Sequence, residues 1–339
     1  RSFAVQPQGA GFELQDNHTF ISNILPTDIE FGLDQKIYLS DWIRGATSDG
    51  LGRIYTASFP EHVDSDEVEN TQTLFASGFT GLEESKLIEL LHHADIRVRQ
   101  RAQFAIAGRG SDAIDSLLPV AREGDNLLAR LHAVWAFGMI ARSDVAVLEH
   151  VASLLSAEEP EVRGQAAKVL GEHRSKDFTE SLIGLLGDDN LRVRSFAAHA
   201  LARIQAPQAI EPLLEMLREN NDQDLFLRHA GVYALYRIGD PDAVAKFADD
   251  EDRSIRLAVL LTLRHFRDQR LSNFLQDSDE SLVVEAARAI HDLPIQSALS
   301  DLARLITRET EDQSLLRRAI NANYRLGQPE HARALTEYV

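Results

Sequence analysis

The pattern of apolar and polar positions repeats along most of this chain. An arginine marks the same place in six successive copies, at Arg99, Arg130, Arg163, Arg194, Arg228 and Arg256. The pattern continues without the arginine at Val283 and Leu316, and successive copies lie 27 to 34 residues apart. A period of this size predicts an array of structural repeats, each made of one supersecondary unit.

Each copy has the features of an amphipathic helix. With the arginine position as zero, an apolar residue stands at −1, as in Val98, and mostly small residues stand at +3 and +6, as in Ala102 and Ala105. These offsets lie along one side of an α-helix, and small side chains there allow another helix to approach closely. Position −4 is Asp, Asn or Glu in every copy, which favours a helix N-cap.

A second apolar run at helical spacing precedes each of these helices, as in Leu87, Leu90 and Leu91. Each repeat is therefore predicted to be a pair of antiparallel helices. One pair cannot bury its own apolar face, so the pairs must stack into a solenoid. The Val-Arg and Ala-x-x-Ala layout over residues 84–339 resembles HEAT repeats, and we expect about eight helix pairs with a short last helix near residues 330–338.

The first sixty residues have a different pattern. Ile29, Phe31, Ile37 and Leu39 alternate around a Leu-Asp-Gln turn, which predicts a β-hairpin, and three further short runs predict more strands. Residues 61–69 contain five acids, which favours a solvated linker. The predicted organisation is a β segment over residues 1–60, an acidic linker over 61–83 and the α-solenoid over 84–339.

Composition narrows the possible functions. The formal net charge of −18 would repel phosphate backbones, so nucleic acid is not an expected partner. Without cysteine the chain has no disulfide, thiolate metal site or CxxCH haem attachment. No apolar run reaches the length of a membrane span. Arg1 in place of methionine suggests a processed or excised fragment, and nothing in the composition fixes the cellular location.

The series "GAGFEL", "LPTDIEFGLDQKIYLSDW" and "GRIY", followed by "LFASGF" and the first repeat, resembles a group of large bacterial proteins best known from planctomycetes. In that family a β-propeller like those of sorbosone and glucose dehydrogenases precedes HEAT repeats and a cytochrome c domain. The resemblance implies that this chain is the middle of such a protein, with about one propeller blade, in a periplasmic or exported location.

The motif positions of that resemblance are Asp28, Asp41, Trp42 and Arg53. They are interpreted either as turn and strand-packing residues or as residues with a cofactor or calcium role in an intact parent protein. Because a propeller site needs several blades around a channel, no catalytic or cofactor-binding residue is assigned in this chain and no cofactor is expected.

Twelve histidines raise the question of a metal site. HEAT-type deoxyhypusine hydroxylase binds iron through His-Glu pairs, whereas this chain has only the reversed order, at Glu61-His62, Glu149-His150, Glu172-His173 and Glu330-His331. These pairs also fall at different places in the repeat. No metal site is predicted, and no nucleophile is placed beside a base.

The six arginines of the repeat have two interpretations. They form a structural ladder, in which each guanidinium pairs with acids of adjacent repeats and the acid at −4 serves as both cap and partner. Alternatively they form a basic binding stripe. The strongly negative net charge favours the ladder.

The +5 position of the repeat is the candidate partner-binding surface. A polar residue is expected there, because this position lies opposite the apolar stripe, but the column begins with aromatic residues. Phe104, Trp135, His199 and Tyr233 are therefore predicted to bind a protein partner on the concave side. The alternative is that these side chains pack against the first helix of their own pair.

Two functions remain open from the sequence. The first is a non-catalytic protein–protein interaction or spacer solenoid, as a fragment of a larger protein whose partner is another protein or another domain of the same parent chain. The second, implied by the resemblance, is part of a quinone-dependent sugar or alcohol dehydrogenase that passes electrons to a cytochrome c domain.

Overall fold

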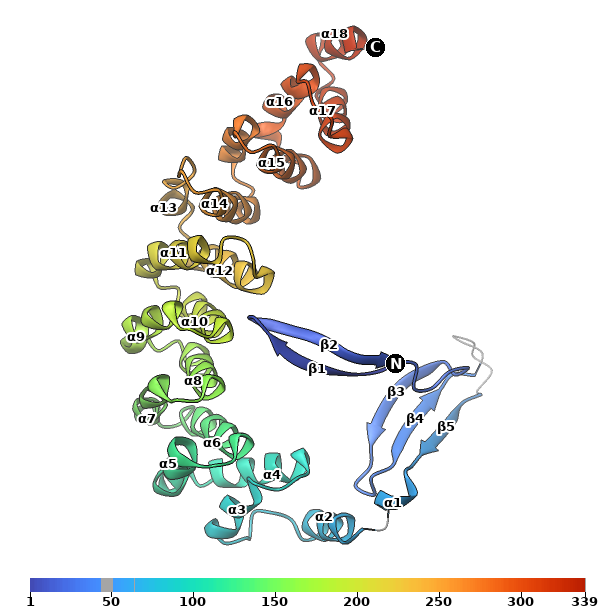
Figure 1. Cartoon of the computed structure of the whole chain (residues 1–339), viewed down its shortest axis with the longest axis vertical. Coiled ribbons are helices and arrows are strands. Elements are labelled where there is room, and N and C mark those ends of the chain that lie inside the picture. The colour runs from blue at the N-terminus through green and yellow to red at the C-terminus, as the bar shows by residue number, and fades with distance from the viewer. Residues whose placement is uncertain (44–50, 64, 339) are drawn as a thin grey trace. The chain divides into compact units, whose positions relative to one another are not determined.

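The computed structural model describes residues 1–43, 51–63 and 65–338. The chain is mainly helical, with short antiparallel strands at its N-terminal end (Figure 1). It divides into two compact units, Arg1–Gln8 with Phe12–Val169, and Gly9–Gly11 with Leu170–Val339.

The N-terminal strands form two separate antiparallel sheets. Their bounds are β1 Ser2–Gln8, β2 Gly11–His18, β3 Pro26–Phe31, β4 Ile37–Asp41 and β5 Arg53–Ala57. The order is β1-β2 in one sheet and β3-β4-β5 in the other, and Ile29 lies opposite Leu39 in the expected hairpin. A propeller blade is a single four-stranded sheet, so the strands do not have the architecture of the expected blade.

Asp41 organises the end of the three-stranded sheet. Its side chain is buried, and Oδ1 accepts hydrogen bonds from the backbone N–H groups of Leu25, at 2.8 Å, and Ile43, at 3.2 Å. Arg53 donates from Nη1 to the hydroxyl of Tyr55 at 3.0 Å. These contacts give Asp41 and Arg53 structural roles in the sheet.

The acidic segment forms helices where its charge predicts a linker. Helix α1 covers Pro60–Val63 and α2 covers Asp66–Ser77, with position 64 outside the described residues. The Ser65 hydroxyl caps α2 by accepting the N–H of Val68, and Asp66, Glu67 and Glu69 lie in the first turn of this helix. Negative charge is favourable there because the helix dipole is positive at its N-terminus.

The second helices of the pairs match the sequence pattern closely. They are α4 Ile96–Ala107, α6 Leu127–Ile140, α8 Pro160–Glu172, α10 Leu191–Ile204, α12 Leu225–Ile238, α14 Arg253–Phe266, α15 Glu280–Asp292 and α17 Gln313–Leu326. The residue at −4 accepts an N–H of the first turn in each capped helix, for example Asn126 from Ala129 and Asp312 from Leu315. The N-cap prediction is confirmed at these positions.

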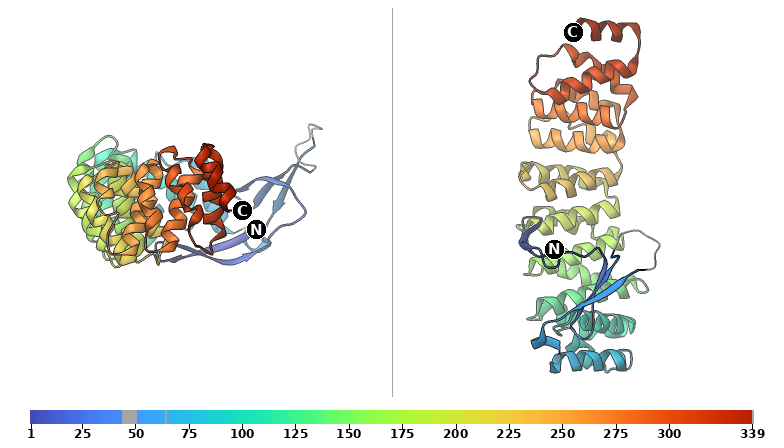
Figure 2. Two further views of the ribbon diagram at one scale, coloured as in Figure 1. Left: turned by 90° about the horizontal axis from the view of Figure 1, so that it is seen from above. Right: turned by 90° about the vertical axis from the view of Figure 1, so that its right-hand side faces the viewer.

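The first helices are on the whole shorter than the second helices and are interrupted by 3-10 turns. Two further views of the ribbon are given in Figure 2. The first helices are α3 Glu84–Leu90, α5 Ile114–Glu123, α7 Leu148–Ala152, α9 Thr179–Gly184, α11 Ile210–Asn220, α13 Pro241–Ala245 and α16 Gln296–Arg304. In the seventh pair a 3-10 helix, η7 Gln269–Gln276, takes this place. Further 3-10 turns extend several of them: η1 Gly110–Ala113, η2 Val145–Val147, η3 Ser153–Ser156, η4 Lys176–Phe178, η5 Leu185–Gly187, η6 Pro207–Ala209 and η8 Leu305–Thr307. Helix α18, Pro329–Tyr338, ends the array as expected.

Small residues on the second helices form the core of the array. Ala102, Ala133, Ala166 and Ala197 at position +3 are all completely buried. At the same position on α12, a β-carbon added to Gly231 would lie 2.7 Å from a methyl carbon of Leu217 on α11. The small residues at position +3 therefore let the two helices of a pair pack closely. The HEAT-like α-solenoid predicted from the sequence is confirmed.

Candidate functional site

The arginines at position zero hold the turn that precedes their own helix. Arg99 donates from Nη1 to the carbonyl oxygens of His93 and Ala94, at 2.7 and 2.6 Å. Four other members also donate to carbonyl oxygens: Arg163 to Ala157 and Glu158, Arg194 to Asp188, Arg256 to Asp250 and Glu251, and Arg130 to Ala121 and Arg122. These bonds satisfy backbone carbonyl groups of the turn between the two helices, or, for Arg130, of the last turn of the first helix. Arg228 instead donates to the carboxylate of Asp222.

Contacts with the next repeat involve other acids than those at −4. Arg194 donates to Glu219 at 2.7 Å, and Arg256 donates to Asp277 at 2.9 Å. Both acids come from the repeat that follows. The residues at −4 serve as helix caps, so cap and ladder partner are separate residues.

A buried polar network connects α4 and α6 in the first unit. Arg99 donates from Nε to Nε2 of His132 at 3.3 Å, and Nδ1 of His132 lies 2.7 Å from Oε1 of Gln103. A guanidinium can only donate, so Nε2 accepts and Nδ1 carries the proton that is donated to Gln103. Burial and the positive charge of Arg99 lower the pKa of His132 to about 4, which keeps the ring neutral at pH 7.

Trp135 connects α6 to the following second helix. Its Nε1 donates to Oε1 of Gln165 on α8 at 2.9 Å, and its ring meets the His132 ring edge-on at 5.0 Å. Gln165 is itself held by Glu161, to which its Nε2 donates at 2.9 Å. The Trp135 side chain is half-buried. Its indole N–H therefore bonds to the neighbouring repeat, while part of the residue stays accessible.

Phe104 lies at the edge of a small cavity in the first unit. The side chain is 41% exposed and lines a cavity of about 380 Å³ together with Phe75, Phe79 and Arg101. Phe75 and Phe79 form an edge-to-face pair with ring centroids 5.4 Å apart. Three phenyl rings thus gather around one accessible hollow.

The second unit holds a comparable ring cluster on α10 and α12. The rings of His199 and Tyr233 are 5.5 Å apart, and His229 stacks on Tyr233 at 6.5 Å. Tyr233 is 36% exposed, while His199 is half-buried. Burial, with the nearby charges of His229 and Arg203, lowers the pKa of His199. The His199 ring is therefore mainly uncharged at neutral pH.

All four residues proposed from the +5 column lie on second helices and keep accessible surface. The structure brings His199 and Tyr233 into contact, and it places Phe104 and Trp135 on successive second helices, α4 and α6. Sequence reasoning missed His132, Gln103 and Gln165. Their signal is weak, because polar residues on an amphipathic helix are expected on its solvated face.

Within residues 1–43, 51–63 and 65–338, no group of three metal-ligating side chains comes together. No helix there is long and apolar enough to cross a lipid bilayer.

The array of short helix pairs with buried small columns defines a HEAT-repeat protein, and the HEAT repeat family matches residues 148–235. Over 202 residues the chain is 30% identical to the bilin biosynthesis protein PecE of Nostoc sp. PCC 7120, covering 55% of this chain and 77% of that protein. The PecE of Mastigocladus laminosus is 29% identical over 183 residues, which cover 50% of this chain and 66% of that protein. The chain belongs to the PecE family of HEAT-repeat proteins.

A solved structure, the complex of CpcE and CpcF of phycocyanin lyase from Nostoc sp. PCC7120, is also similar in fold. It is 18% identical, with 76% of this chain and 95% of that chain covered and a TM-score of 0.37.

These relatives show that the expected membership of the planctomycete dehydrogenase family is wrong. The repeat columns that supported it arise from helix-pair packing, which HEAT proteins of many functions share. The N-terminal strands, which supported it further, form two small sheets. The propeller blade, the cytochrome c domain and the exported location lose their basis with that resemblance.

Proposed function

We propose that this chain is a non-catalytic docking subunit in bilin metabolism, which binds a bilin-accepting protein through the exposed rings of its second helices. The relationship to PecE, whose name assigns it to bilin biosynthesis, supports the metabolic context. The observation that carries the docking role is the presence of accessible aromatic side chains in each unit, Phe104 and Trp135 in the first and Tyr233 in the second, at a helix position that would otherwise be polar.

Aromatic side chains that are already held in place suit this role. Trp135 is fixed by Gln165, and Tyr233 is packed between His199 and His229. A partner that covers these rings gains apolar burial without having to immobilise them first. Tyrosine and tryptophan also supply a polar group at the edge of an apolar ring, which suits a surface that is wet before binding.

The negative net charge of the chain favours a partner whose contact surface is surrounded by basic residues. The chain carries 53 acidic residues and 35 Lys and Arg residues, so its formal net charge is −18 at pH 7. Opposite charge on the partner would accelerate association, and salt would slow it.

Titration calorimetry of the chain with isolated phycocyanin subunits, prepared with and without bilin, tests the proposal. We expect binding with a dissociation constant of about 1 µM or tighter, which corresponds to roughly 8 kcal/mol. We also expect that the chain alone attaches no free bilin to the subunit. If the chain binds neither form of the subunit, the docking role is contradicted. If the chain alone attaches free bilin to the subunit, the non-catalytic role is contradicted.

A further inference from the structure

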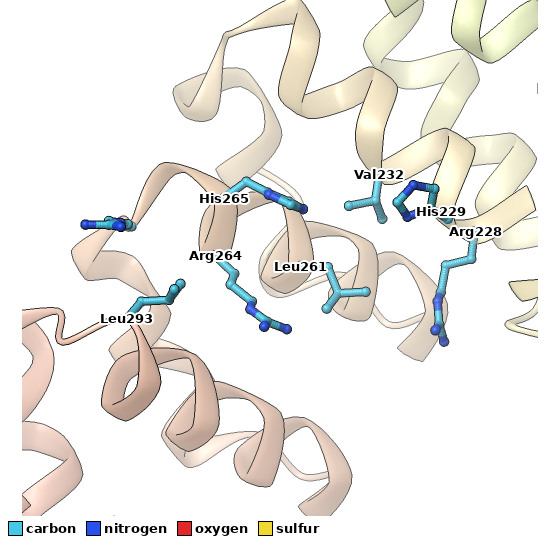
Figure 3. A pocket seen from close by; sticks show the side chains of 8 residues that line it. Arg228, His229, Val232, Leu261, Arg264, His265 and Leu293 are labelled. Carbon is cyan, nitrogen blue, oxygen red and sulfur yellow. The ribbon is translucent and has the colours of Figure 1, made fainter. Parts of the chain in front are cut away.

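A basic pocket lies on α12 and α14 in the second unit. It has a volume of about 560 Å³ and is drawn in Figure 3. The side chains that line it are Arg228, His229, Val232, Leu261, Arg264, His265, Arg267 and Leu293. Its size lies within the usual range for small-molecule sites.

The lining is unusual for so acidic a protein. Three arginines and two histidines line the pocket, and no acid is among the lining residues. Across the whole chain acids outnumber Lys and Arg, at 53 to 35. From the composition, more acids than bases would be expected around a pocket, whereas the lining of this pocket contains three arginines and no acid.

The surrounding acids balance only part of this charge. Arg228 pairs with Asp222, and Arg264 donates from Nη1 to Glu285 at 2.7 Å. Within the described part of the chain, no salt bridge or side-chain hydrogen bond is recorded for the guanidinium of Arg267. A guanidinium has five N–H donors, so Arg264 also retains capacity for a second acceptor.

Two histidines lie beside the arginines of the pocket. Figure 3 shows His229 and Arg228 extending from one helix, and Arg264 and His265 from the next. Burial, with the charges of Arg264 and His229, lowers the pKa of His265. The positive charge of Arg264 disfavours protonation of His265, and a bound anion would offset that charge.

The rest of the lining is apolar. Val232 is buried on α12, Leu261 is half-buried on α14, and Leu293 follows α15. An inorganic ion would leave this surface in contact with water. A ligand with an apolar body would bury it and gain hydrophobic free energy.

We propose that this pocket binds a small organic anion, with its phosphate or carboxylate group held by Arg264 and Arg267 and its apolar body against Val232 and Leu261. Arginine suits both kinds of group, because its planar N–H pairs match two acceptor oxygens at once. Small-molecule binding here does not depend on the docking function, and either can fail without the other.

Calorimetry with the full chain and four probes tests the pocket. Phenyl phosphate and benzoate carry an anion on an apolar ring, inorganic phosphate carries the anion alone, and benzyl alcohol carries the ring alone. We expect at least one of the two aromatic anions to bind about tenfold more tightly than both inorganic phosphate and benzyl alcohol. Which aromatic anion binds more tightly identifies the preferred anionic group. If benzyl alcohol or inorganic phosphate binds as well as the aromatic anions, the proposal is overturned.

Two variants locate the binding. Arg267→Gln removes a guanidinium that forms no ion pair within the described residues, so the variant should fold normally. Its affinity for the preferred anion should fall about tenfold. Arg304→Gln is the matched control, because Arg304 lies on α16, is highly exposed and pairs only with Asp301 in the recorded ion pairs. Its affinity should equal that of the wild type. Equal affinity of Arg267→Gln and wild type would place the anion elsewhere and overturn the proposal.

Discussion

Arg99 on α4 donates a hydrogen bond to His132 on α6, and both side chains are buried. The bond joins second helices of successive repeats through a neutral imidazole ring. Because the ring must accept at Nε2, protonation of His132 would turn this bond into a repulsion between two cations. The network is therefore a part of the fold whose stability depends on pH.

Acidification should weaken the fold through His132. Its pKa is about 4 in the folded chain and about 6.5 in an unfolded chain, so the unfolded state binds the proton more readily. Its contribution is fully present above pH 6.5 and is lost as the pH falls toward 4, by roughly 3 kcal/mol. Urea unfolding at pH 7 and pH 4.5 measures the change.

His132→Gln isolates this effect, because an amide can accept from Arg99 and donate to Gln103 without titrating. The variant should lose less stability than the wild type between the two pH values. His92→Gln, at an exposed position, serves as the control and should follow the wild type. Identical pH profiles for all three proteins would show that His132 does not carry the dependence.

Arg194→Ala should destabilise the second unit. The guanidinium, 15% exposed, donates to the Asp188 carbonyl and to Glu219, and these charge-assisted bonds are worth about 2 kcal/mol together. Arg101→Ala, on the exposed side of α4, should change stability by less than about 0.5 kcal/mol. Thermal and urea unfolding compare the two. Similar losses would argue against a structural role for the arginine column.

Gly171→Ala should destabilise the contact between α8 and α10. An added β-carbon would lie 2.5 Å from Cα of Ala200, so the two helix backbones would have to separate. We expect a loss of about 2 kcal/mol from this overpacking. Gly184→Ala is the matched control, since nothing lies within 4 Å of its added carbon, and it should be neutral or stabilising by up to about 1 kcal/mol. Equal effects on the unfolding midpoint would contradict close packing at Gly171.

Much of the fold could be predicted because it depends on local signals. A cap such as Asn126 and a small residue such as Ala133 mark each second helix by position alone. The first helices lack such marks, and nothing in the sequence distinguished η7 from an α-helix. Helix α2 also has a local signal, because Ser65 followed by Asp66, Glu67 and Glu69 is typical of a helix N-terminus, whereas the acidic composition alone favours a linker.

The site could be predicted only in part, for a different reason. Phe104 and Tyr233 stand out because aromatic residues are unexpected on a polar face. Burial of His132 depends on how Arg99 and Gln103 of the preceding repeat pack against it. The spacing of residues along the chain does not show that these three side chains meet. The basic pocket likewise joins Arg228 and Arg264, which are separated by a full repeat and meet only through stacking.

The most direct test of the docking account is the affinity of three variants for the phycocyanin subunit that binds the wild type. Trp135→Ala and Tyr233→Ala remove proposed anchors, whereas Tyr324→Ala removes a tyrosine that is 75% exposed on α17, outside the proposed surface. With folding checked by circular dichroism, the first two should bind at least about tenfold more weakly and the third like the wild type. Equal dissociation constants for all three variants and the wild type would contradict the account.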